Sequence, residues 1–565
     1  MKKIYKYLCI IALISINNAC EKDFLKEEPI DFLSTENAFL TENDFNASIN
    51  NLYGLLRTEF YTVNDFNPME YLYRTDVAFQ ITTQTPNMDA DFSPNSGIIS
   101  NHWTRLYKIV AEANTIISRL PNSQLSDAKK PLFEAKAKFF RAFAYRSLAY
   151  LYGGVPLVLE EVASEKVDFV RATRKEVYTQ VINDLTFAVA NLPGITAVKD
   201  GEVSSLAAQH LLAEVYLADG QFQNAVNAAT AVIDDPNTGL MTARFGSRSM
   251  ETPGDVYWDL FRRNNQNRAS AGNKEAIWVI QIETDVLGGS AVSSAQAGSY
   301  LLERVHPPLI RDVRIDGVAP FLWPAGDYTG GRGVGFLAPS DYFTYTLYQS
   351  DFDNDIRNAN HNFVRAYQSN NPASPYFGQM ISIHNVPPNT TGTGGSVITS
   401  SKPDRAFYPY QTKCTTPFNH PGALYISPAP YPFALKPSAG GTYTDQYMFR
   451  LAETYLIRAE AYLGLNNTTM AAEDINVVRR RANATDVMPG NVDIDYILDE
   501  RMRELGVEEK RMLTLMRLGK LVDRVKKCNP FYAPGMKDHF NLWPIPQAEI
   551  ERNRGAVLEQ NPGYN

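Results

Sequence analysis

The chain has 565 residues, of which 44% are hydrophobic and 12% aromatic, so it is long enough to bury a large core. Its formal net charge is −8, and the body of the chain carries no run of lysines and arginines. Because nucleic acid is bound by a cationic surface, these features argue against nucleic acid as a partner. The 31 tyrosines, 29 phenylalanines, 34 glycines and 33 prolines instead predict a protein with substantial ordered loops.

The N-terminus has the organisation of an export signal. Basic residues begin the chain, an apolar run follows over residues 8–16, and small or polar residues lead to Cys20. Residues 1–19 are therefore predicted to be a lipoprotein signal peptide, because the apolar run is far shorter than the ~20 residues that span a bilayer. Cys20 follows a small residue, as in a bacterial lipobox, and is predicted to be lipidated, for example with palmitate. Asn17 and Asn18 depart from that pattern, and an ordinary signal peptide is the alternative.

The stretch that follows Cys20 is short and charged, from Glu21 to Pro29. We expect residues 20–40 to form a lipidated tether and an N-terminal strap, which hold the protein on a membrane through acyl chains. No other segment approaches the length that spans a bilayer. The mature protein is therefore predicted to be anchored to a membrane and not embedded in it.

Residues 41–235 have the spacing of a helical scaffold. Thr41 and Asp44 form a capping-box start, and apolar residues then recur at helical intervals. Further helices are predicted over residues 103–117, 133–151, 174–192, 204–218 and 222–233. Alanines at the expected helix contacts, with tyrosine and phenylalanine as wedges, resemble tetratricopeptide repeats.

Residues 236–448 interrupt this scaffold. They are rich in glycine, proline, serine, threonine and tyrosine, and only residues 276–281 alternate as a strand does. Because loops carried on a rigid frame usually hold the binding site, we expect the ligand site in this insertion.

Residues 449–565 return to helical spacing. Helices are predicted over residues 450–463, 470–482, 494–505 and 508–526, and a proline-rich strap follows them. The predicted fold is thus mainly α, a tetratricopeptide-like scaffold of helix pairs with a large irregular, loop-rich insertion.

Six segments carry a family resemblance. They are Cys-Glu-Lys-Asp-Phe-Leu at 20–25, the helix at 103–114, the helix and Gly-Gly-Val-Pro turn at 135–158, the helix pair at 450–479, the charged helices at 500–517, and the ending at 542–564. In this order they resemble the SusD/RagB family of outer-membrane nutrient-binding lipoproteins of Bacteroidetes. The resemblance extends from residue 20 to the C-terminus and is weakest in the middle third.

The resemblance implies a non-catalytic subunit on the outer membrane, facing the cell exterior. It implies a helical lid over a SusC-like, TonB-dependent transporter, and nutrient uptake by delivery of an oligosaccharide or other glycan. A peptide-binding subunit of the same architecture, and a lid without a ligand of its own, are the alternatives.

The residues themselves argue against catalysis. The seven histidines are scattered without a His-Glu-x-x-His pattern, and no Gly-x-Ser-x-Gly motif occurs. The acidic residues of positions 500–509 alternate with arginines at helical spacing, which predicts an ion-pair network. A glycosidase, which needs only two placed carboxylates among the 62 acidic residues, is the weakest alternative.

No cofactor and no metal are predicted. Residues 351–355 are similar to the start of a calcium loop but lack its glycine and its final glutamate, and are interpreted as a turn. The glycine-rich stretch 330–335 lacks the Lys-Ser/Thr of a phosphate-binding loop. Cys414 and Cys528 form either one disulfide or a free pair.

Sugar binding requires an exposed aromatic platform with polar groups around it. Trp323 is the first candidate platform because it lies in a loop rich in turn residues and aromatics, and packing within that loop is the alternative. Trp103, Trp278 and Trp543 are predicted to lie in the core. Further ligand contacts are expected from Tyr300, Tyr328, Asp76, Gln80, Asn101, Gln296 and Arg332.

Overall fold

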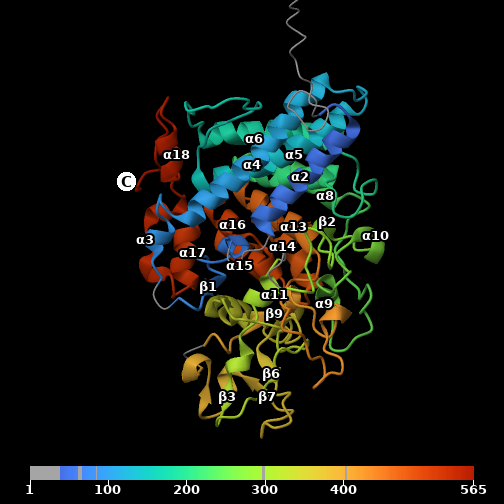
Figure 1. The fold of residues 1–565 in the computed structure, drawn as a ribbon, viewed down its shortest axis with the longest axis vertical. Helices are drawn as coiled ribbons and strands as arrows, with labels where there is room; N and C mark the ends of the chain where they lie inside the picture. Colours follow the sequence, from blue (N-terminus) through green and yellow to red (C-terminus); the bar gives the residue numbers. More distant parts are fainter. Residues whose placement is uncertain (1–38, 62–66, 84–85, 295–299, 401–403, 565) are drawn as a thin grey trace, which may run out of the picture.

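A computed structural model describes residues 39–61, 67–83, 86–294, 300–400 and 404–564. The predicted signal peptide, Cys20 and Gln296 lie outside the described residues. Helices fill the upper half of the molecule in Figure 1, and loops with short strands fill the lower half. The expectation of a mainly α fold with a loop-rich insertion is confirmed.

The first part of the scaffold consists of consecutive helices, and apart from the short α3 each packs against the next. After α2 (Glu42–Phe60) and the short α3 (Met88–Asp91) come α4 (Gly97–Arg119), α5 (Lys130–Tyr152), α6 (Arg174–Asn191), α7 (Ser205–Ala218) and α8 (Phe222–Ile233). The capping box of Thr41 and Asp44 begins α2, as the sequence predicts.

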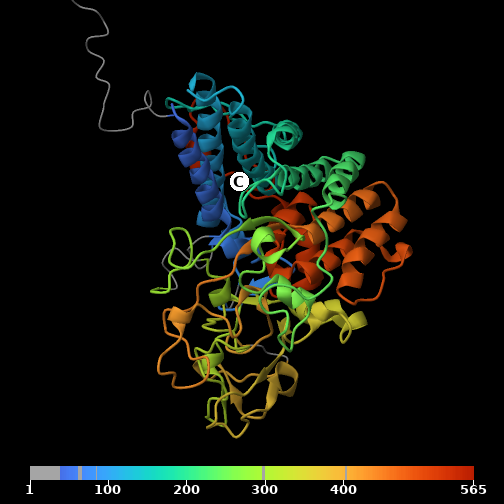
Figure 2. The ribbon, with the colours of Figure 1, turned by 90° about the vertical axis from the view of Figure 1, so that its right-hand side faces the viewer.

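The scaffold resumes after the insertion. Its second part comprises α13 (Leu451–Gly464), α14 (Thr468–Arg481), α15 (Ile494–Glu504), α16 (Arg511–Arg517), α17 (Leu521–Cys528) and α18 (Gln547–Arg552). Helix α13 packs against α8, as Figure 2 shows, so the two parts form one stack. Ala213, Ala225 and Ala461 lie at this junction, where small side chains let three helices approach closely.

The prediction of a single helix over residues 508–526 is wrong. The chain there divides into α16 and α17, with a turn at Gly519, whose φ of 63° is left-handed. A left-handed residue ends a right-handed helix, and glycine adopts that conformation without steric cost.

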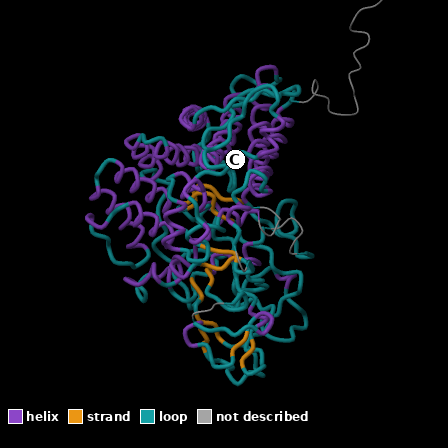
Figure 3. Tube along the Cα trace, turned by 90° about the vertical axis from the view of Figure 1, so that its left-hand side faces the viewer, coloured by secondary structure: helices purple, strands orange, loops and turns teal. Residues whose placement is uncertain are grey.

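The insertion contains short elements only, visible as isolated strands among loops in Figure 3. Its helices are α9 (Val256–Leu260), α10 (Arg268–Ala271), α11 (Leu302–Val305) and α12 (Asp341–Thr344). The strands of the described residues form five antiparallel two-stranded ribbons: β1 (Ala78–Gln80) with β4 (Leu337–Pro339), β2 (Ala276–Ile280) with β10 (Gln446–Arg450), β3 (Arg314–Ile315) with β8 (Thr390–Thr391), β5 (Phe363–Val364) with β9 (Tyr410–Gln411), and β6 (Ala366–Gln368) with β7 (Met380–Ser382).

None of the helices in the described part of the chain is both long enough and apolar enough to cross a membrane.

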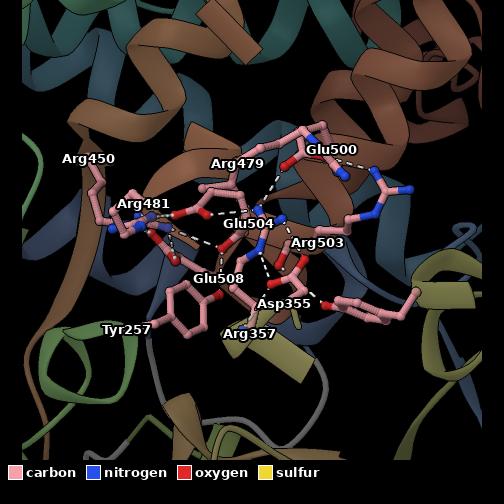
Figure 4. A network of polar contacts seen from close by, with 12 residues as sticks. Tyr257, Asp355, Arg357, Arg450, Arg479, Arg481, Glu500, Arg503, Glu504 and Glu508 are labelled. Carbon is pink, nitrogen blue, oxygen red and sulfur yellow. Dashed lines mark hydrogen bonds and ion pairs between the residues drawn. The ribbon is translucent and has the colours of Figure 1, made fainter. Parts of the chain in front are cut away.

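A buried ionic network joins the insertion to the scaffold (Figure 4). Arg450 donates to Glu275 at 2.6 Å and to Glu504 at 2.5 Å, and Arg481 contacts the same two carboxylates. Glu275 precedes β2 in the insertion, whereas Arg481 ends α14 and Glu504 ends α15. All four side chains are almost completely excluded from solvent.

Arg357 carries a second connection through the same network. It lies in the insertion and contacts Asp355 at 2.7 Å, Glu500 at 2.8 Å and Glu504 at 3.1 Å. Burial opposes ionisation of Glu500, but its arginine partners Arg357, Arg479 and Arg503 outweigh burial and lower the pKa of Glu500 to about 2. The acidic residues of α15 are therefore structural ion-pair partners, as the sequence predicts.

We expect Glu504→Gln to lower the free energy of unfolding by about 3–5 kcal/mol at neutral pH, because Arg450 and Arg481 would remain buried with only one of their two shared carboxylates, Glu275. Urea unfolding measures the change. The matched control is Glu473→Gln, which breaks the half-exposed pair with Arg480 and should cost less than about 1 kcal/mol. Equal costs for the two variants would contradict a structural role for the network.

A separate buried cluster of one histidine and two carboxylates joins α2 to α4. The imidazole of His102 contacts Glu59 through Nδ1 and Glu70 through Nε2, the latter at 3.1 Å, and Tyr71 donates to Glu59 at 2.5 Å. Burial disfavours the imidazolium, but the two carboxylates outweigh it and raise the pKa of His102 to about 9. His102 is therefore cationic in the folded protein at neutral pH.

The stabilisation from His102 should be complete below its unfolded pKa of about 6.5 and should disappear as the pH rises through about 9. We expect the difference in unfolding free energy between wild type and His102→Gln to shrink by about 3 kcal/mol over that interval. Chemical denaturation at a series of pH values gives this difference, and a difference that stays constant would contradict the charged state.

Candidate ligand-binding site

Three loops of the insertion meet in the lower half of the molecule. The loop of residues 320–335 lies between segments 416–426 and 431–436, with which it shares main-chain hydrogen bonds. The amide of Gly326 donates to the carbonyl of Phe433 at 2.8 Å, and the carbonyl of Gly326 accepts from Phe418 at 2.6 Å. These bonds fix the three loops relative to one another.

Trp323 is held within this group of loops by its edge. Its Nε1 donates to the carbonyl of Gly333 at 3.3 Å, and the half-buried ring packs against the main core. The guanidinium groups of Arg311 and Arg332 lie 4.9 Å and 5.6 Å from the ring centroid. The indole is thus a fixed, partly exposed platform with cationic neighbours.

A row of aromatic rings leads from the core to the surface of the same loops. Tyr328 packs against the buried Trp258 with ring centroids 5.8 Å apart and against Phe418 at 5.2 Å, and Phe418 packs against Phe433 at 4.9 Å. Phe418 is 38% exposed and Phe433 is 42% exposed. Aromatic side chains this exposed in ordered loops supply flat apolar surface for a ligand.

Phe418 and Phe433 both have left-handed backbones, with φ of 63° and 57°. For residues other than glycine this conformation costs on the order of 1 kcal/mol, and it persists where the surrounding structure enforces it. The bonds to Gly326 supply that constraint. Sequence reasoning missed both residues, although a Pro-Phe dipeptide occurs in each of the three loops and was the available signal.

A buried polar pair packs against the loop of residues 320–335. Glu303 and His420 are almost fully buried and are joined by a 2.7 Å contact. Gly331 leaves little space above them, because a Cβ there would lie 3.1 Å from Glu303 Oε1. A Cβ at Gly326 would lie 2.9 Å from His420 Nδ1. Glycine is therefore required where the loop crosses the pair.

The structure places the predicted ligand residues in different surroundings. Tyr328 and Arg332 lie with Trp323 in the loop of residues 320–335. Gln80 is half-buried in β1, where it pairs in register with Leu337 of β4, and Asn101 is exposed near the start of α4 in the helical half. Of these four residues, only Tyr328 and Arg332 share a loop with Trp323.

Tyr300 and Asp76 lie in the interior and not on a surface open to a ligand. Tyr300 is 4% exposed and packs against Tyr61 with ring centroids 5.2 Å apart. Asp76 is fully buried, and its carboxylate accepts from Arg511 at 2.7 Å and from Arg524 at 2.9 Å. Two arginines outweigh burial and lower the pKa of Asp76, so its role here is an internal ion pair.

Three tryptophans, two cysteines and the stretch 351–355 have structural surroundings in the protein. Trp103, Trp278 and Trp543 are buried, and Cys414 and Cys528 are free, buried thiols. Asp351 and Asp355, in the calcium-like stretch, are engaged by Arg479 and Arg357. Within the described ranges, no group of three or more histidine, cysteine or acidic side chains is arranged to hold a metal ion.

A hollow of about 400 Å³ lies in the helical half. Its floor includes Trp103 and Tyr107 of α4, and its walls include Phe169 and α18. Asn553, which lines the hollow, is already hydrogen-bonded to the backbone of Phe169. This hollow is the competing location for a ligand.

Two sequence models of related families match this chain. The model described as the SusD family matches residues 316–564, and the one described as starch-binding associating with outer membrane matches residues 23–217. The chain belongs to the SusD family. The match from residue 316 covers the loop of Trp323 and the second part of the scaffold.

Some relatives match over their full lengths. SusD-like protein P2 of Formosa agariphila is 27% identical, with both chains covered completely. A laminarin binding SusD-like protein superposes with a TM-score of 0.65 at 22% identity, covering 93% of this chain and 100% of that one. Surface glycan-binding protein A from Bacteroides fluxus gives 0.63 at 20% identity, with 93% and 100% covered. These two structures share the fold of this chain.

We expect Gly333→Ala to lower the free energy of unfolding by about 2 kcal/mol or more, since its Cβ would lie 2.6 Å from the carbonyl of Pro308 and 2.7 Å from that of Pro307. Backbone atoms cannot turn aside as a side chain can. Gly422→Ala is the control, because its Cβ meets nothing within 4 Å, and it should change stability by less than about 0.5 kcal/mol. Chemical denaturation compares the two, and a neutral Gly333→Ala would contradict the tight loop geometry.

Proposed function

We propose that this SusD-family protein is a non-catalytic binding protein that captures an oligosaccharide at the cell surface, in the loops around Trp323. The partly exposed indole, held in place by its bond to Gly333, is the observation that carries the proposal. A sugar ring presents a face of C–H groups that packs on an aromatic ring, and its hydroxyls bond to polar groups at the rim. Similar proteins described as laminarin binding and as surface glycan-binding support this choice.

The carboxylates near Trp323 support a binding role without hydrolysis. Asp312 is paired with Arg311 at 3.0 Å. Asp327 accepts hydrogen bonds from Thr329 and from Asn370, at 2.5 Å and 2.8 Å. Glycoside hydrolysis uses an acid and a base or nucleophile facing each other across the bond, and both carboxylates here are turned to protein partners.

We propose different roles for the parts of the chain, with the boundaries that the sequence predicts. Residues 41–235 and 449–565 form the scaffold, and residues 236–448 carry the ligand loops. Lipidation of Cys20 would hold the protein on the outer face of the outer membrane, where it would deliver its ligand to a TonB-dependent transporter. Anchoring beside a partner raises the local concentration of ligand at the transporter, so a modest affinity per site suffices.

We expect Trp323→Ala to weaken oligosaccharide binding about tenfold or more, since stacking of a sugar on an aromatic ring contributes roughly 1–2 kcal/mol. Isothermal titration calorimetry of residues 21–565 against a panel of neutral and acidic oligosaccharides and mixed peptides measures the loss. Phe377→Ala is the control, because Phe377 is 57% exposed in the β6–β7 turn, outside the three loops.

If Trp323→Ala left the binding of a sugar intact, the binding site would lie elsewhere. Binding of peptides without binding of any sugar would favour the peptide-binding alternative. Silence from the whole panel would favour a lid that acts only with its transporter, and turnover of a bound sugar would indicate an enzyme.

A further inference from the structure

The groups that surround the Trp323 ring are predominantly cationic. Arg311 and Arg332 both lie within cation–π distance of the indole, at 4.9 Å and 5.6 Å from its centroid. The Arg311 side chain is 53% exposed, and its Nε contacts Asp312 at 3.0 Å. Its guanidinium therefore lies over the indole, on a side chain that is half open to solvent.

Arg405 adds a cation whose charge Asp312 and Asp404 offset only through space, without a direct ion pair within the described residues. Its Nε donates to the carbonyl of Val334 at 2.6 Å, and its guanidinium lies 4.5 Å from the ring centroid of Phe336. Among the ion pairs of the described residues, none involves Arg405, although this protein pairs most of its buried arginines with carboxylates. The neighbouring Asp404 accepts hydrogen bonds from Thr393, from Ser396 and from the amide of Ala406, so its oxygens are turned to these neutral donors, although its charge still acts on Arg405.

Arg405 lies close to the platform. Trp323 bonds to the carbonyl of Gly333 and Arg405 bonds to the next carbonyl, that of Val334. Burial lowers the pKa of Arg405 and Arg311 acts in the same direction, whereas Tyr408, Asp312 and Asp404 act against it. Arg405 therefore lies within electrostatic reach of Arg311 and its partner Asp312.

We propose that the site around Trp323 takes an acidic oligosaccharide. A sugar ring packs on the indole, and its carboxylate or sulfate group is bound by Arg311 and Arg405. The planar guanidinium matches both oxyanions with paired hydrogen bonds, which a neutral sugar does not offer. This inference rests on the proposed function, since it names the class of glycan that the same site selects.

The test compares acidic oligosaccharides with neutral derivatives of the same backbone, by calorimetry on residues 21–565. One arm uses an oligogalacturonide and its methyl ester, and the other uses a sulfated galactan oligosaccharide and its desulfated form. We expect the acidic form of at least one arm to bind about tenfold or more tightly than its neutral partner. The preference should shrink as salt is added, because ions screen the arginines.

Arg405→Gln and Arg311→Gln should each reduce that preference about tenfold, measured as the ratio of the acidic to the neutral affinity within each variant. Arg311 is half exposed, so its variant remains informative if Arg405→Gln unfolds. The control Arg552→Gln removes an equal charge from α18, where the side chain is 75% exposed, and should change nothing.

Equal affinity for acidic and neutral forms, or an acidic preference that survives both arginine variants, would overturn this inference while leaving oligosaccharide capture intact. Tighter binding of a glutamate-rich peptide than of any sugar would also overturn it. Silence from every oligosaccharide, acidic and neutral, would instead overturn the proposed function.

Discussion

The structure depends on the buried ionic network in which α15 lies between the two parts of the chain. Glu500 and Glu504 take their arginine partners from the insertion, through Arg357, and from the scaffold, through Arg450 and Arg481. Charges so deeply buried are tolerated only when each has a partner, so the network has a narrow range of acceptable geometries. An insertion of short ribbons and loops thereby acquires a fixed position on a helical frame.

That position matters because the insertion has little regular structure to fix it from within. Its strands are two to five residues long and pair only in twos. Order in the ligand loops comes from main-chain bonds through Gly326, from the Glu303–His420 pair beneath them, and from the bond that holds Trp323. A platform positioned in advance loses less entropy when a ligand binds, which favours a binding protein that must capture a dilute glycan.

The sequence predicted the helices because amphipathic periodicity and capping residues are local signals. Thr41 with Asp44 marked the start of α2, and the alternating acids and arginines of α15 marked an ion-pair network. It did not predict the partners of that network, since most come from segments far away in the chain and only Glu500 with Arg503 pairs within α15. Asp76 and Tyr300 were selected by type and position, whereas burial, which removes them from the surface, is set by tertiary packing. Phe418 and Phe433 were not predicted because their exposure, too, is set by tertiary packing.

A crystal structure of residues 21–565 with a bound oligosaccharide would show where the ligand lies. We expect a sugar ring against the indole of Trp323, within reach of Arg311 and Arg405. A sugar in the hollow beside α4, on Trp103 and Tyr107, with the three loops unoccupied, would contradict this expectation.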